Sequence, residues 1–148
     1  MPIEPKDILL VEDDPCDAEL ALEALGAHDL ARRVELARDG EEALDFLHRR
    51  GRFAGRPGGA PAVVVLDLKI PKLNGLEVLA AIRADDRLRP LPVVILTSSR
   101  EKRDVAEAYR LGATAYVVKP LDFGAFSRAV ERIGLFWAET NEGPPVQE

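Results

Sequence analysis

The chain has 148 residues, which is the length of one domain with a substantial core and too short for two ordinary domains. Apolar residues make up 47% of the sequence, so a chain that is disordered throughout is excluded. The 26 Asp and Glu outnumber the 20 Lys and Arg, and the net charge of −6 argues against non-specific binding to the phosphates of nucleic acid.

The single cysteine and the N-terminal residues bear on the cellular compartment. Cys16 has no second cysteine with which to form a disulfide in the chain, which fits a reducing environment. The first residues lack the charged start and apolar run of a signal peptide, and no apolar stretch approaches the about 20 residues that span a bilayer. We therefore expect a cytoplasmic protein without membrane contact.

Five short apolar runs are predicted to be β-strands. Four of them, at residues 8–11, 63–66, 93–96 and 115–118, are apolar or aromatic throughout, whereas 34–37 alternates with a polar residue. A strand that is apolar at every position is buried on both faces, as in a parallel sheet covered by helices. The alternating run is typical of an edge strand.

Helical patterns separate these runs. Asp14-Pro15 is an N-cap followed by a first-turn proline, and Gly112 follows the fourth helical segment as a C-cap signal. The expected helices begin at Pro15, at Gly40, after Asn74, at Glu101 and at Phe123. In the last of them, apolar residues recur at steps of three and four from Phe123 to Trp137.

Strands and helices thus alternate five times, which predicts an α/β fold with a doubly wound parallel sheet. Right-handed crossovers leave few topologies, and the flavodoxin-like (βα)5 order 2-1-3-4-5 is favoured. We expect one domain over residues 1–137, with an enlarged loop at 49–61, and a flexible C-terminal tail over 138–148. In such sheets ligands bind beyond the carboxyl ends of the strands, where the strand order reverses.

Polar side chains follow four of the five strands at that end. They are Glu12, Asp13 and Asp14 after the first strand, Asp67 after the third, Thr97 and Ser98 at the end of the fourth, and Lys119 at the end of the fifth. Carboxylates that lie close together repel one another unless a cation joins them, and Mg²⁺ prefers such oxygen ligands. Aspartate can accept a phosphoryl group, and a lysine can neutralise its charge. The pattern predicts a Mg²⁺-dependent phosphoryl-acceptor site.

The same residues resemble the receiver domains of two-component response regulators. The matching motifs are LVEDD at 10–14, LDLKIP at 66–71 with NG at 74–75, LTS at 96–98, GA at 112–113 and YVVKP at 116–120. The resemblance covers about residues 6–137 of the chain. More narrowly, the loop at 49–61 and the Phe136-Trp137 ending resemble regulators that pair with bacteriophytochrome-type histidine kinases.

The resemblance implies a role for each of these residues. Asp67 would accept the phosphoryl group from the phosphohistidine of a sensor kinase, and the chain would catalyse only its own phosphorylation and dephosphorylation. The implied metal ligands are Glu12, Asp13, Asp67 and the carbonyl of Lys69, and the implied phosphoryl contacts are Thr97, Ser98 and Lys119. Tyr116 would change rotamer when Thr97 moves, shifting the face formed by the fourth and fifth helices and the last strand, and Lys119–Pro120 would be a cis peptide bond.

Two alternatives stay open on the sequence. A haloacid-dehalogenase-like phosphatase also uses an aspartyl nucleophile with Mg²⁺, but it needs a second Asp two residues later, where this chain has Lys69. A degenerate receiver would only bind a partner, which the complete set of acids, hydroxyl and amine argues against. Lys69 and Ser99 also depart from common receiver residues at positions that flank the attacking water, so the lifetime of the phosphorylated form is an open question.

The last helix carries more apolar residues than one buried face requires. An apolar surface of this kind often has a partner. We therefore expect a homodimer, with the interface formed by Phe126, Ala129, Ile133, Phe136 and Trp137.

Overall fold

The computed structural model describes residues 7–26 and 34–142, and it confirms the predicted parallel sheet. Its strand order is β2-β1-β3-β4-β5, and every neighbouring pair is parallel. The strands are β1 Ile8–Val11, β2 Val34–Ala37, β3 Val63–Leu66, β4 Val93–Thr97 and β5 Ala115–Val118. The strand order reverses between β1 and β3, which places the ends of these two strands next to each other.

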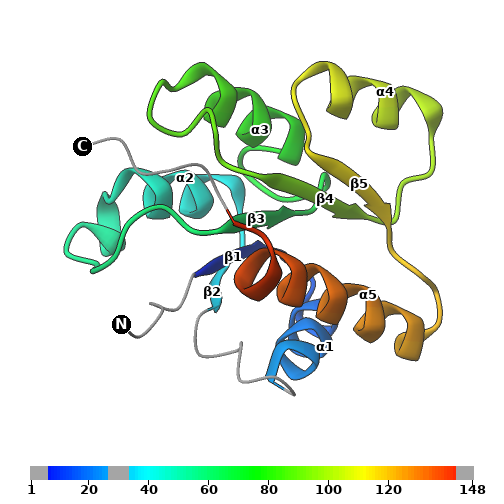
Figure 1. Cartoon of the computed structure of the whole chain (residues 1–148). Helices are drawn as coiled ribbons and strands as arrows, with labels where there is room; N and C mark the ends of the chain where they lie inside the picture. The colour runs from blue at the N-terminus through cyan, green and yellow to red at the C-terminus, as the bar shows by residue number, and fades with distance from the viewer. Residues whose placement is uncertain (1–6, 27–33, 143–148) are drawn as a thin grey trace.

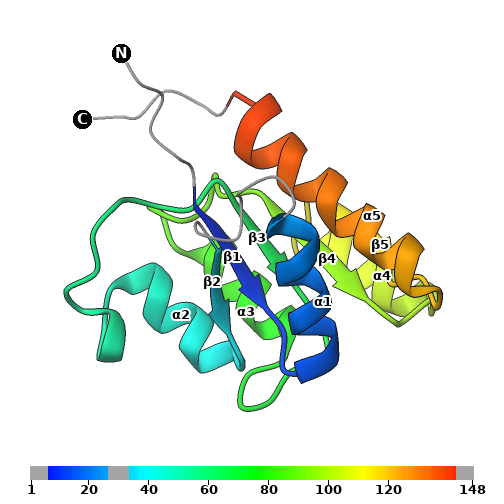
Figure 2. The ribbon, with the colours of Figure 1, turned by 90° about the horizontal axis from the view of Figure 1, so that it is seen from below.

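In the described part of the chain, five α-helices cover the sheet in two layers. They are α1 Pro15–Gly26, α2 Gly40–His48, α3 Gly75–Ala84, α4 Lys102–Arg110 and α5 Phe123–Leu135. Helices α2, α3 and α4 lie on one face and α1 and α5 on the other (Figure 1). Seen from below, α1 and α5 lie side by side (Figure 2), and they are in contact with each other. No helix within the described residues combines the length and apolar character needed to cross a bilayer.

The continuous apolar runs make strands because both faces of the sheet are covered. In β1, Leu9 and Val11 pack in the core beneath α2 and α3, whereas Ile8 and Leu10 pack in the core shared with α1 and α5. Each of these residues is at most 3% exposed. Alternate side chains of one strand therefore serve two separate cores, as the period of a strand requires.

The loop expected at 49–61 begins with regular structure. Arg49 adopts a left-handed backbone conformation with φ of 55° and ends α2, and a 3₁₀ helix follows at Gly51–Phe53. Phe53 is buried with its ring edge-to-face against Phe46 at 5.2 Å, and the Arg56 guanidinium lies 3.9 Å from the Phe46 ring centre. Part of this loop is thus folded onto the body of the domain.

The last helix extends beyond the boundary predicted from the sequence. After α5 the chain makes a π-helical turn at Phe136–Thr140, and Ala138 within it is buried. Residues 143–148 lie outside the described residues, so the flexible tail stays a prediction.

The residues expected at a dimer interface are not equivalent in the structure. Phe126 is 4% exposed and packs in the core beneath α5, so it was wrongly assigned to a surface. Phe136 is 46% exposed, and Ala129, Ile133 and Trp137 are half-buried. Phe123, at the start of α5, is 73% exposed although the helical period had placed it on the apolar face.

Candidate functional site

The end of β1 delivers one buried acid and two exposed ones. The backbone N–H of Glu12 donates to the carbonyl of Ala37 at 2.9 Å, which fixes Glu12 at the strand end with 4% of the residue exposed. Asp13 and Asp14 are exposed. Asp14 Oδ1 accepts hydrogen bonds from the backbone N–H groups of Cys16 and Asp17 at 2.8 and 3.1 Å, so Asp14 caps α1.

The end of β3 places Asp67 beside Glu12. Its backbone N–H donates to Val11 at 3.2 Å, and the residue is 8% exposed. Its Oδ1 accepts from the backbone N–H of Lys69 at 3.2 Å. Gly75 packs so closely that an added Cβ would lie 2.3 Å from the Asp67 carbonyl oxygen. The glycine of the NG motif therefore lets α3 begin directly against the loop that carries the acid.

The ends of β4 and β5 supply the hydroxyl and the amine. Thr97 is the last residue of β4 and is 1% exposed, and the backbone N–H of Lys119 donates to its carbonyl at 2.7 Å. The Lys119 side chain, 8% exposed, donates to Asp67 Oδ2 at 2.8 Å and to Glu12 Oε1 at 2.5 Å. Side chains from three separate strand ends are thus joined by direct hydrogen bonds.

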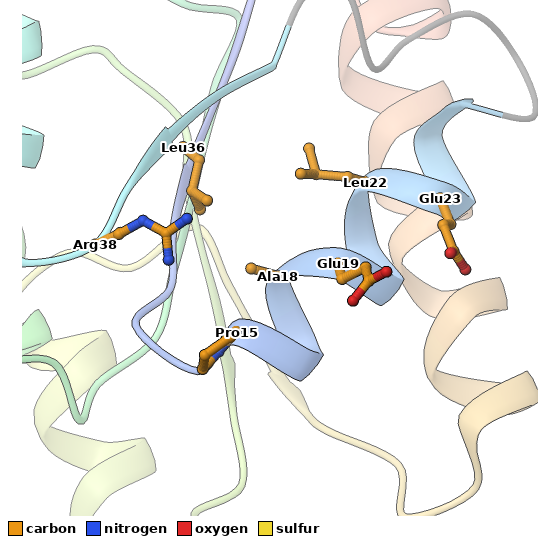
Figure 3. Close-up of a pocket in the computed structure, with 7 residues that line it drawn as sticks. All are labelled: Pro15, Ala18, Glu19, Leu22, Glu23, Leu36 and Arg38. Carbon is orange, nitrogen blue, oxygen red and sulfur yellow. The ribbon is translucent and has the colours of Figure 1, made fainter.

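One hollow of about 400 Å³ contains nearly all the site residues predicted from the sequence. It is lined by Glu12, Asp13, Asp14, Pro15, Asp17, Asp67, Lys69, Thr97, Ser98 and Lys119. A second hollow, of about 490 Å³, lies on the other side of α1 (Figure 3). There Leu36 of β2 and Arg38, which follows this strand, face Ala18 and Leu22 of α1, and no set of acids, hydroxyl and amine converges. The chemistry therefore belongs to the smaller hollow.

The electrostatics of the site follow from burial and from the ammonium group. Burial raises the pKa of Glu12 to about 7, against the opposing hydrogen bond and charge of Lys119. Burial alone would lower the pKa of Lys119, but its hydrogen bonds to Asp17, Asp67 and Glu12 outweigh burial and raise it. Lys119 therefore stays charged at neutral pH and offsets part of the negative charge of the hollow.

The donor set suits a hard cation, although no ready-made cluster is present. Among the described residues, no three His, Cys, Asp or Glu side chains are grouped so that they could hold a metal ion as they stand. The Lys119 ammonium group lies between Glu12 and Asp67, and Asp13 is exposed. Still, five carboxylates and two ammonium groups line the hollow, and this excess of oxygen ligands and negative charge fits Mg²⁺ or a similar ion.

Tyr116 lies outside the hollow but is linked to it through Ser99. The Tyr116 hydroxyl donates to the carbonyl of Ser99 at 3.0 Å, and the backbone N–H of Ser99 donates to Thr97 Oγ1 at 3.5 Å. The Ser99 hydroxyl in turn donates to Asp104 Oδ2 of α4 at 2.5 Å. A movement of Thr97 would therefore reach both the tyrosine and α4 through Ser99.

The structure corrects one expectation and adds residues that sequence reasoning missed. The described residues contain no cis peptide bond, so the expected cis Lys119–Pro120 bond was wrong, and Lys119 reaches the acids with this bond trans. The isomers of such bonds differ little in intrinsic energy, so the local packing decides between them. Asp17 was not predicted, yet its Oδ2 accepts from Lys119 at 2.8 Å. The one signal for Asp17 in the sequence is its position: it is an acid in the first turn of the helix that follows the acidic end of the first strand.

The sequence matches the response regulator receiver domain over residues 8–131. The chain belongs to this family. It is 41% identical over 141 residues to the probable methanogenesis regulatory protein FilR2 of Methanothrix harundinacea, covering 95% of this chain and 89% of FilR2. It is 38% identical over 136 residues to the response regulator Rcp1 of Synechocystis sp., covering 92% and 91% of the two chains.

Solved structures of phytochrome-associated regulators share the fold of this receiver domain. The phosphorylated cyanobacterial phytochrome response regulator RcpA superposes with a TM-score of 0.88 at 35% identity, covering 96% of this chain and all of RcpA. The Mn²⁺-bound form of Rcp1 gives 0.86 at 37% identity, covering 95% and 100%. The bacteriophytochrome response regulator AtBRR gives 0.75 at 54% identity, also covering 95% and 100%.

These similarities define the general role of the chain. It is a response-regulator receiver domain with a phosphoacceptor role in two-component signalling, a family of switches that bind a divalent metal ion. Of the regulators it resembles, RcpA is a cyanobacterial phytochrome response regulator and AtBRR is a bacteriophytochrome response regulator. The phosphatase alternative is not supported, because the whole matched region belongs to the receiver family.

Proposed function

We propose that Asp67 is the phosphoacceptor and that the donor is the phosphohistidine of a sensor kinase. The observation that carries this assignment is the 2.8 Å contact between Lys119 Nζ and Asp67 Oδ2 within a hollow lined by acids. An oxygen of Asp67 would attack the phosphorus atom while the bond to the imidazole nitrogen breaks and its electron pair stays on the imidazole. Later attack by water on the phosphorus would restore the carboxylate, so the chain would catalyse only its own phosphorylation and dephosphorylation.

The cation that assists this transfer is, in our proposal, Mg²⁺. Glu12, Asp13, Asp67 and the backbone carbonyl of Lys69 would hold it, since all four supply oxygen ligands at one hollow. When bound, the ion would neutralise charge on the phosphoryl oxygens. Lys119, Thr97 and the exposed Ser98 would contact the phosphoryl group itself.

The switch would run from Thr97 to the face formed by α4, β5 and α5. Movement of Thr97 toward the phosphoryl group would pull on Ser99, which the Tyr116 hydroxyl and Asp104 hold. Phosphorylation would thus shift the population of two arrangements of Tyr116 and α4. The changed face would act on another molecule of this chain or on a protein partner rather than on nucleic acid.

Similarity to AtBRR and RcpA supports a bacteriophytochrome kinase as the donor. A histidine kinase makes its phosphohistidine from ATP, so pairing with one would place the receiver in the cytoplasm.

The assignment predicts that the chain incorporates one phosphoryl group. Incubation with a small phosphoryl donor such as acetyl phosphate and Mg²⁺ should add one phosphoryl mass by intact mass spectrometry. The label should be lost on alkaline treatment, as expected of an acyl phosphate, and should not form when EDTA removes the cation. A label that survives alkaline treatment would overturn the proposal. The absence of a label with both the small donor and a phosphorylated kinase would overturn it as well.

The exposed end of the last helix supports a homodimer. Phe136 is 46% exposed and its ring lies edge-to-face with Trp137 at 4.9 Å, so the two residues form an aromatic pair at the surface. Ala129 and Ile133 lie further back along the same helix and are half-buried. Aromatic anchors of this kind contribute much of the binding energy of protein interfaces.

The variant Phe136→Asp should weaken self-association at least about tenfold, because a charge would replace an aromatic anchor that the proposed interface would bury. Sedimentation velocity over a concentration series measures the change, with and without the phosphoryl donor. Phe123→Asp is the matched control, since Phe123 is 73% exposed at the opposite end of α5. Equal sedimentation of the two variants and the wild type would rule out the proposed interface.

A further inference from the structure

Asp17 is a third carboxylate on the ammonium group of Lys119. A lysine has three N–H donors, and the structure engages three acceptors: Glu12 Oε1 at 2.5 Å, Asp67 Oδ2 at 2.8 Å and Asp17 Oδ2 at 2.8 Å. Asp17 belongs to the first turn of α1, whereas the other two acids follow strands of the sheet. The amine of the site is therefore tied to a helix as well as to the strand ends.

The three contacts differ in how easily they can be exchanged. The side chains of Glu12 and Asp67 are 5% and 10% exposed, whereas that of Asp17 is 30% exposed. A buried carboxylate that loses its ammonium partner is left poorly solvated, which is costly. Asp17 can instead be rehydrated when Lys119 leaves it, so the Asp17 contact is the one that is released most easily.

A phosphoryl group on Asp67 needs a donor that Lys119 does not have free. All three N–H groups face carboxylates, and each oxygen of the phosphoryl group is a strong acceptor. One contact must therefore be exchanged when a phosphoryl oxygen binds to the ammonium group, and exposure identifies Asp17 as the partner that is given up.

On the basis of the function proposed above, we propose that Asp17 is a positioning residue that holds Lys119 in the resting site and competes with the phosphoryl group for it. This contact restrains the amine between α1 and the sheet until an anion replaces the Asp17 carboxylate. Loss of Asp17 should then favour the phosphorylated arrangement. In the unphosphorylated protein, loss of Asp17 should increase the mobility of the Lys119 side chain.

The competition can be measured with beryllofluoride, a phosphoryl analogue, in the presence of saturating Mg²⁺. Asp17→Ala should bind it about two- to fivefold more tightly than the wild type, the range expected for exchange of one partly exposed ion pair. Asp17→Glu keeps a carboxylate near the amine and should bind it like the wild type. Glu19→Ala is the matched control, since it removes an exposed carboxylate of the same helix that does not line this hollow.

A second readout needs neither metal nor analogue. The protons of the Lys119 ammonium group should exchange with water faster in Asp17→Ala than in the wild type and Glu19→Ala, as followed by nitrogen-detected NMR of the labelled lysine. Unchanged exchange together with unchanged beryllofluoride affinity would overturn the inference. Weaker binding by Asp17→Ala, or an equal gain in Glu19→Ala, would overturn it as well, because Asp17 would then assist the anion or act only through net charge.

Failure of this inference is separable from failure of the phosphoacceptor assignment. If the wild type neither incorporates a phosphoryl group nor binds beryllofluoride, the assignment of Asp67 fails, and the exchange rates still decide whether Asp17 restrains Lys119. If the wild type does both and the Asp17 variants match it in both readouts, only the inference about Asp17 fails.

Discussion

Asp67→Asn should abolish labile phosphorylation of the chain by both a kinase and a small phosphoryl donor. The amide lacks the carboxylate oxygen that attacks phosphorus, and its single oxygen can accept from Lys119 or from the Lys69 backbone N–H but not from both. The variant should still fold, because the charge of Asp67 raises the pKa of Glu12 and neutralising it removes that repulsion. Intact mass spectrometry after exposure to the donor measures the label.

The control for this variant is Asp39→Asn. Asp39 is a buried acid that caps α2 by accepting from the backbone N–H of Glu42 at 2.8 Å, and asparagine caps helices equally well. It lies outside the hollow that holds Asp67, so this variant should be labelled like the wild type. Full labelling of Asp67→Asn at the wild-type rate would show that another side chain is the acceptor.

The fold was predictable from the sequence because its strands are buried on both faces. Runs such as 63–66 contain only Val and Leu, and this uniform pattern is compatible with few environments other than a covered parallel sheet. The chain order of the polar residues at the strand ends then located the site, since parallel strands present their carboxyl ends at one edge. Glu12, Asp67, Thr97 and Lys119 are brought together there as expected.

The features that the sequence could not predict depend on packing between residues that are far apart in the chain. The contact between Asp17 and Lys119 joins residues 102 positions apart, and no pattern within α1 distinguishes Asp17 from a solvated first-turn acid. The helical period likewise placed Phe123 and Phe126 on one apolar face, although only Phe126 lies over the sheet core. Phe123 belongs to the first turn of α5 and is 73% exposed, which periodicity alone could not show.

The largest effect on stability is expected for Lys119→Ala. This change removes the partner of two buried carboxylates, Glu12 and Asp67, and should lower the free energy of unfolding by about 2–4 kcal/mol. The exposed Lys102 at the start of α4 provides the control, because Lys102→Ala should change stability by less than about 0.5 kcal/mol. Urea denaturation followed by the fluorescence of Trp137 measures both.

The pH dependence of this loss tests its electrostatic origin. Lys119 lowers the pKa of Glu12, so its removal should raise that pKa further above the unfolded value. A group with a raised folded pKa stabilises the fold at low pH and loses that contribution as pH rises through the folded pKa. Below about pH 7 Glu12 is protonated in both folded proteins, so the difference between wild type and Lys119→Ala should change little there. It should grow from about pH 7 to about pH 9, where only the variant still loses this contribution. A difference that stays constant over this range would show that Lys119 stabilises the domain through packing of its aliphatic chain rather than through the acids of the site.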